Sequence, residues 1–253
     1  MRILRVRPGF QADHSSSSYL FYAQDGEVSA AGQRIAHRFS SHADVDGQFA
    51  RYQKWGESEL SDEAYKALLG QHYDVMASES YDSWKLMIAV PKTKDREELL
   101  EVFHDIDDGE FVRLDVHDYG KRLGIEVYCE FDYEGPVFQS HEDPLEELVE
   151  LLVEVRGEII EGNISFLQAV AAFYLSETEE SEDEEEDFEV PEDWSKAQLQ
   201  EECERRGIAF RKSWTKDELR QALTSAVSPM DRIGKPGKLS RAASRIVKSL
   251  THI

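Results

Sequence analysis

An acidic segment divides the sequence and limits what the chain can fold into. Residues 177–190 contain ten Asp or Glu residues and no Lys or Arg. Such a run cannot bury enough apolar surface to offset the entropy lost on ordering, and its charges repel one another. We therefore expect residues 177–190 to form a disordered acidic linker, which acts as a solvated spacer, masks a basic tail or mimics DNA.

Charge also differs between the two sides of this linker. Residues 1–176 carry a net charge of −18 and residues 191–253 a net charge of +5, within a total of −23. An asymmetry of this size indicates separate units with different partners.

Composition restricts the compartment in which such a chain works. The mean hydropathy is −0.56, and no apolar run approaches the roughly 20 residues that a spanning helix needs. Arginines alternate with apolar residues at the start of the sequence, so it lacks the long apolar centre of a secretory signal. Two cysteines, Cys129 and Cys203, are too few for a disulfide framework or a Cys-rich zinc site. We expect a cytoplasmic protein without a membrane span.

Apolar spacing in residues 1–176 predicts an α+β domain with a mostly antiparallel sheet. The expected strands are 2–7, 19–23, 73–77, 84–90, 110–116 and 122–133, and the expected helices are 30–39, 61–69, 95–103, 145–160 and 165–175. In the last strand apolar residues alternate with mostly polar ones, so one face is buried and the other is wet. That alternation favours antiparallel over parallel pairing.

The polar cluster Asp13–Ser18 contains the residue types of a nucleophilic triad. Neighbours in sequence rarely reach the geometry of a triad, and no Gly-x-Ser-x-Gly turn is present. Local hydrogen bonds to the backbone explain these serines more simply, so no catalytic residue is assigned. Residues 9–18 also resemble an opening found in many uncharacterised phage and bacterial proteins, with His14 in place of Asn. That resemblance implies a bacterial or phage source and no activity.

Two groups of side chains contain metal-ligand types. His37, His42, Asp44 and Asp46 have a spacing that matches no coordination geometry, and the Asp-x-Asp-Gly here lacks the bidentate Glu of a calcium loop. A solvated loop is the preferred interpretation.

The second group lies at a strand end and on the strand expected beside it. It consists of Asp115, His117, Asp118, Glu126 and Glu130. Clustered carboxylates bind the magnesium used in phosphodiester chemistry, but such groupings also arise by chance in an acidic domain. No metal or cofactor is therefore assigned.

The last part of the chain contains two copies of a similar six-residue motif, WSKAQL at 194–199 and WTKDEL at 214–219. In each copy the Ser or Thr is an N-cap, and the Gln or Glu three residues later returns the hydrogen bond, which makes a capping box. The Trp and Leu at the two ends occupy the positions of a hydrophobic staple. Gly207 ends the first helix, residues 208–213 form an extended link, and the second helix runs to about Ala226.

This helix, extension and helix in residues 191–226 resemble the helix-extension-helix superfamily, which includes the HeH, SAP, LEM and Rho N-terminal modules. The matching residues are Lys196, Leu199, Gly207, Ile208, Lys216, Glu218, Leu219 and Leu223. The second Gly usual in the SAP link is missing and Trp214 stands near its place, which favours the HeH branch. The resemblance covers residues 194–226 and implies binding of DNA or RNA, or of a protein as in the LEM branch.

Position at the link and at the start of the second helix assigns phosphate contacts to Arg211, Lys212, Lys216 and Arg220. Trp214 is a further candidate because its ring can stack on a base, with the staple as the alternative. Basic and acidic residues balance in 191–226, so strong DNA binding by this module alone is not expected.

The basic tail, residues 227–253, contains an expected amphipathic helix at 238–250. Apolar residues line one side of it, and the other side carries Lys238, Arg241, Arg245 and Lys248. Such a helix adds phosphate contacts, lies on an anionic membrane or enters a partner's groove. Packing on its own protein is the remaining alternative.

Together these features predict a non-enzymatic bacterial or phage adaptor. The C-terminal module and tail would contact DNA or RNA, and the acidic domain would contact a protein partner. One alternative is a metal-dependent enzyme that acts on nucleic acid and uses the module as a substrate tether. Another is a purely protein-docking subunit of a larger assembly.

Overall fold

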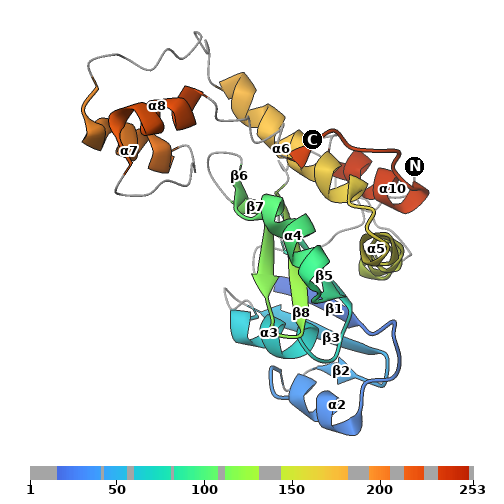
Figure 1. Ribbon diagram of the computed structural model, residues 1–253. Coiled ribbons are helices and arrows are strands. Elements are labelled where there is room, and N and C mark those ends of the chain that lie inside the picture. Colours follow the sequence, from blue (N-terminus) through green and yellow to red (C-terminus); the bar gives the residue numbers. More distant parts are fainter. Residues whose placement is uncertain are drawn as a thin grey trace.

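The computed structural model describes residues 16–40, 43–55, 60–80, 83–107, 112–130, 144–181, 194–205, 214–224 and 233–250 (Figure 1). Within these ranges the centre of the fold is an eight-stranded sheet. Its strands are β1 (Ser16–Tyr22), β2 (Asp44–Val45), β3 (Phe49–Trp55), β4 (Val75–Glu79), β5 (Ser83–Pro91), β6 (Ile106–Asp107), β7 (Val112–Asp118) and β8 (Arg122–Glu130). They lie in the order β2-β3-β1-β4-β5-β8-β7-β6, and each neighbouring pair is antiparallel.

Helices cover both faces of this sheet, which makes the fold α+β as expected (Figure 1). The helices are α2 (Ala30–Ala36), α3 (Asp62–Leu69), α4 (Lys94–Leu100), α5 (Pro144–Ile160), α6 (Ser165–Ser181), α7 (Lys196–Arg205), α8 (Lys216–Thr224) and α10 (Arg241–Leu250). On one face α5, α6 and α10 enclose the larger core, and on the other α2 and α3 enclose a second core rich in tyrosine.

The alternation that predicted the antiparallel sheet is confirmed in β8. Leu123, Ile125 and Val127 are buried under the helices of the larger core, whereas Glu126 and Tyr128 on the opposite face are partly exposed. Most other expected strands and helices are found near their predicted bounds. The strand expected at 2–7 lies outside the described residues.

The β2–β3 hairpin was not predicted from the sequence. Its strand β3 places Ala50 and Tyr52 in the second core, while Phe49 and Arg51 lie on the opposite face of the sheet, where they line a groove. The turn is held by Asp46, whose Oδ1 accepts the N–H groups of Gln48 and Phe49 at 2.6 and 2.9 Å. Polar residues separate the apolar ones along β3, so no uninterrupted apolar run marks this strand in the sequence.

The acidic block begins inside a helix. Residues 177–190 were expected to form a disordered linker, but α6 continues through Ser181. Glutamate is a good helix former, so a helix already anchored in the core extends into such a sequence at little cost. Residues 182–190 lie outside the described part.

The C-terminal helix packs on its own domain, which was one of the alternatives that the sequence left open. It begins at Arg241 rather than at the expected residue 238, because Ser240 caps it by accepting the Ala243 N–H at 3.0 Å. Ala242, Ala243 and Ile246 are buried in the larger core, against α5 and α6.

A buried ion network fixes α5 to the sheet. The Arg156 side chain of α5 is 2% exposed, and its guanidinium contacts Asp74, which is equally buried, at 3.0 Å and Asp25 at 2.6 Å. Its Nε also donates to the Ala89 carbonyl of β5 at 2.8 Å. Hydrogen bonding to Arg156 lowers the pKa of Asp25. Arg122 adds a second cation 3.2 Å from Asp74.

Removing the buried cation is expected to be costly. Arg156→Met keeps most of the side-chain volume but leaves the Asp74 carboxylate short of a partner, so the free energy of unfolding is expected to fall by about 3–5 kcal/mol. Urea denaturation measures this loss. The double variant Arg156→Met/Asp74→Asn is expected to recover part of it because both charges are gone.

The control for this experiment is Lys94→Met, which breaks an exposed ion pair with Glu98. It is expected to change the unfolding free energy by less than about 1 kcal/mol. Equal losses for Arg156→Met and Lys94→Met would contradict a structural role of the buried network.

Candidate functional site

The helices α7 and α8 begin with the capping boxes that the sequence predicts. In the first, the Ser195 N–H donates to Gln198 Oε1 at 2.8 Å and the Gln198 N–H donates to Ser195 Oγ at 3.3 Å. In the second, the Thr215 N–H donates to Glu218 Oε2 at 2.6 Å and the Glu218 N–H donates to Thr215 Oγ1 at 3.2 Å. The hydrogen bond from the Thr215 backbone lowers the pKa of Glu218.

The two helices share a small core of their own. It consists of Leu199, Cys203, Leu219 and Leu223, with Trp194 and Trp214 packed against it. Both tryptophans thus lie where the predicted hydrophobic staples place them. Packing at this position leaves the Trp214 ring only partly accessible, so its first role is structural.

The residues proposed to contact nucleic acid are placed unequally. Lys216 is exposed at the first position of α8, and Arg220, one turn later, is partly buried. Arg211 and Lys212 lie outside the described residues, as does the expected extension between the helices.

The basic residues of the tail are divided by the packing of α10. Lys238 and Arg241 are exposed, but Arg245 turns toward α5 and forms an ion pair with Glu147. Arg245, one of the predicted nucleic-acid contacts, is therefore paired within the domain in this structure. Lys248 lies in α10, and its side chain is outside the described part.

A second polar cluster lies on the partly open face of the sheet, where β5, β7 and β8 are neighbours. His117 Nε2 is 2.9 Å from Glu126 Oε2, and Lys85 Nζ is 3.2 Å from Glu126 Oε1. Asp115 contacts both His117, at 3.5 Å, and His104 Nδ1, at 3.1 Å. Two histidines, two carboxylates and a lysine thus form one chain of contacts across the strands.

The ionic contacts perturb the titration of this cluster. Hydrogen bonding to Glu126 raises the pKa of His117 despite its partial burial. Burial acts to raise the pKa of Glu126, but His117 and Lys85 outweigh it and lower that pKa overall. The cluster is therefore satisfied by its own charges.

The structure brings together only part of the metal-ligand group considered from the sequence. Asp115, His117 and Glu126 meet, whereas Asp118 pairs with Lys92 at 2.9 Å away from them. The side chain of Glu130 lies outside the described part. Among the residues described, no group of three or more His, Cys, Asp or Glu side chains is arranged to hold a metal ion.

The other sequence candidates are dispersed. His37 is exposed after α2, Asp44 begins β2, and Asp46 holds the β2–β3 turn. His42 falls outside the described residues, as do Asp13, His14 and Ser15 of the polar cluster, whereas Ser16–Ser18 form the start of β1.

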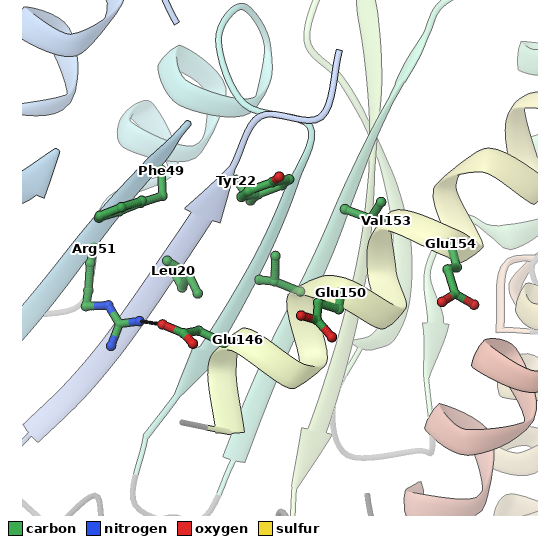
Figure 2. A pocket seen from close by; sticks show the side chains of 9 residues that line it. Leu20, Tyr22, Phe49, Arg51, Glu146, Glu150, Val153 and Glu154 are labelled. Atoms are coloured by element: carbon green, nitrogen blue, oxygen red, sulfur yellow. Dashed lines mark hydrogen bonds and ion pairs between the residues drawn. The ribbon is translucent and has the colours of Figure 1, made fainter. Parts of the chain in front are cut away.

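A groove between α5 and the sheet was not found by sequence reasoning (Figure 2). It has a volume of about 490 Å³ and is lined by Leu20, Tyr22, Phe49, Arg51, Glu146, Val149, Glu150, Val153 and Glu154. Apolar side chains of β1 and β3 form the floor, and α5 forms one wall. The available sequence signal was the spacing of four residues between the α5 glutamates, which places them along one line of a helix.

No protein-family model matches the chain, and neither a curated protein nor a solved structure matches it. Among the described helices, none is long and apolar enough to cross a membrane.

The ion pair of His117 predicts a pH dependence of stability. Because the pKa of folded His117 lies above the ordinary value of 6.5, the pair stabilises the fold below pH 6.5 and its contribution is lost as the pH rises through the folded pKa. NMR titration of the His117 ring is expected to give a pKa above 6.5 in the native chain and a lower one in Glu126→Gln.

Comparison with His117→Gln isolates this contribution from the other histidines. The difference in unfolding free energy between the native chain and His117→Gln is expected to shrink as the pH rises above 6.5. A His117 pKa that does not respond to Glu126→Gln would show that the contact is not formed in solution.

Proposed function

We propose that this chain is a non-enzymatic adaptor whose α7–α8 pair, with the basic residues around it, contacts DNA or RNA while the α+β domain contacts a protein partner. The observation that carries the proposal is the self-contained character of the pair. Its helices have their own caps and their own core, and that core shares no residue with the two cores of the sheet. A small unit of this kind suits a separate binding task. The resemblance of residues 194–226 to helix-extension-helix modules supports nucleic acid as the ligand.

The contacts to phosphate would come from side chains rather than from helix N-termini. The first N–H groups of each helix are partly occupied by the capping boxes, and the carboxylate of Glu218 lies at the start of α8. A phosphate at that end would meet a negative charge. Lys216, Arg211 and Lys212 are therefore the cations on which binding would depend.

The tail would contribute less than its composition suggests. Arg245 is paired with Glu147, which leaves Lys235, Lys238 and Arg241 as the exposed basic side chains described before and at the start of α10. Moderate affinity, with a salt dependence limited by the small number of cations, is the expectation for a chain with a net charge of −23.

A reducing compartment, the cytoplasm of a bacterium or of a phage-infected cell, fits this proposal. Cys129 and Cys203, the two cysteines of the chain, are both buried as thiols, one in the larger core and one in the α7–α8 core. Burial raises the pKa of Cys129 to about 12, so its reactive thiolate is suppressed.

Fluorescence anisotropy of the full chain with labelled single- and double-stranded DNA and RNA, repeated across salt concentrations, tests the nucleic-acid contact. The variant Arg211→Glu/Lys212→Glu/Lys216→Glu is expected to bind at least about tenfold more weakly. For duplex DNA the slope of log affinity against log salt is expected to lose about 0.9 per phosphate contact removed.

A charge-matched control is Arg38→Glu/Lys94→Glu/Lys121→Glu, whose three residues are exposed on the α+β domain. It changes the net charge equally and is expected to bind nucleic acid like the native chain. Equal losses in both triple variants would reduce the effect to bulk charge. An absence of binding by the native chain at low salt would favour the protein-docking alternative.

A further inference from the structure

The groove beside α5 exposes part of the sheet that the helices leave uncovered. Helix α5 lies over β1, β4 and β5, and β3 lies beyond it. Leu20 and Tyr22 of β1 and Phe49 of β3 thus form an apolar floor next to the helix, and Tyr22 and Phe49 are only partly buried (Figure 2).

The wall of the groove is acidic. Glu146, Glu150 and Glu154, which line the groove, follow one another at intervals of four residues. Figure 2 shows them spread along α5, with Glu146 facing Arg51 and Glu154 farthest from the floor residues. Glu146 is paired with Arg51 of β3 at 2.9 Å. Glu150 and Glu154 are exposed, and neither has an ion pair within the described part of the chain.

The opposite side of α5 shows what kind of segment this helix binds. There the basic amphipathic helix α10 packs Ala242, Ala243 and Ile246 into the core and pairs its Arg245 with Glu147. Helix α10 thus lies on α5 through an apolar stripe and a cation opposite a glutamate, with α6 as a second contact. The groove offers the same two elements, an apolar floor and glutamates, without an occupant among the described residues.

We infer that this groove binds a basic amphipathic helix of a partner protein. Apolar residues of the partner pack on Tyr22 and Phe49, and its Lys or Arg side chains pair with Glu150 and Glu154. The inference rests on the protein-partner half of the proposed function and names the class of that partner.

Other classes of ligand fit the groove less well. Nucleic acid is repelled because the wall carries uncompensated carboxylates beside a domain of net charge −18. An added strand has no edge to pair with at the floor, since β1 is hydrogen-bonded to β3 on one side and to β4 on the other. A helix needs no backbone partners and presents apolar and basic side chains together.

A peptide with the sequence of residues 238–250 is a suitable probe because its parent segment contains the helix that packs on α5. The fluorescein-labelled peptide is titrated against the full chain and followed by anisotropy. Saturable binding that weakens with salt is expected. Glu150→Lys/Glu154→Lys is expected to weaken it at least about tenfold, because the partner's cations then meet like charges.

The matched control is Glu98→Lys/Glu101→Lys, which makes the same change in net charge at exposed positions outside the groove. It is expected to bind the peptide within about twofold of the native chain, since long-range charge effects are screened. A peptide with the same composition but a scrambled apolar stripe is expected to bind more weakly to the native chain. Circular dichroism and urea midpoints establish that both variants remain folded.

Three results would overturn the inference. The peptide does not bind the native chain, or the two double variants bind it equally, or the peptide with the scrambled stripe binds as well as the original. The second result would mean that the peptide binds through the overall negative charge of the chain or takes the place of α10. Nucleic-acid binding by Glu150→Lys/Glu154→Lys is measured in parallel, so that failure of the groove and failure of the nucleic-acid contact are told apart.

Discussion

The guanidinium of Arg156 is the contact on which the arrangement of the α+β domain depends. It joins α5 to the loop after β1, to the residue before β4 and to the backbone of β5, and the side chains of Arg156 and Asp74 are almost fully buried. A charge buried to this degree is tolerated only if carboxylates surround it, so Asp25 and Asp74 hold the helix in one position. Because α10 packs on one side of α5 and the groove lies on the other, the positions of both depend on how this network places α5.

Sequence periodicity predicted the parts of the fold in which a local pattern decides the structure. The alternation in β8 and the two capping boxes depend on residues close in sequence, and each is confirmed. The β2–β3 hairpin was missed because its stability comes from pairing with β1, which sequence windows do not contain. The groove was missed for a related reason: its floor and its wall are about a hundred residues apart, and only the sheet order brings them together.

The placement of α10 also changes how the charge of the chain is distributed. In the sequence, the basic tail and the acidic domain carry opposite net charges and are separated by an acidic block. In the fold they are in direct contact through Arg245 and Glu147, so part of the positive charge that composition assigns to nucleic acid is neutralised internally. The cations that stay exposed in this part of the chain include Lys216 of α8 and Lys235, Lys238 and Arg241 before and at the start of α10.

The anchoring of residues 233–250 on the domain has a topological consequence. Ile233 is buried in the larger core, and its carbonyl accepts a hydrogen bond from the Gln168 side chain of α6. The α7–α8 pair is therefore connected to the domain on both its N-terminal and its C-terminal side. The shorter of the two connecting segments, between Thr224 and Ile233, can span at most about 30 Å. The pair therefore stays within that reach of the domain, and a single cut in either connection would leave it attached.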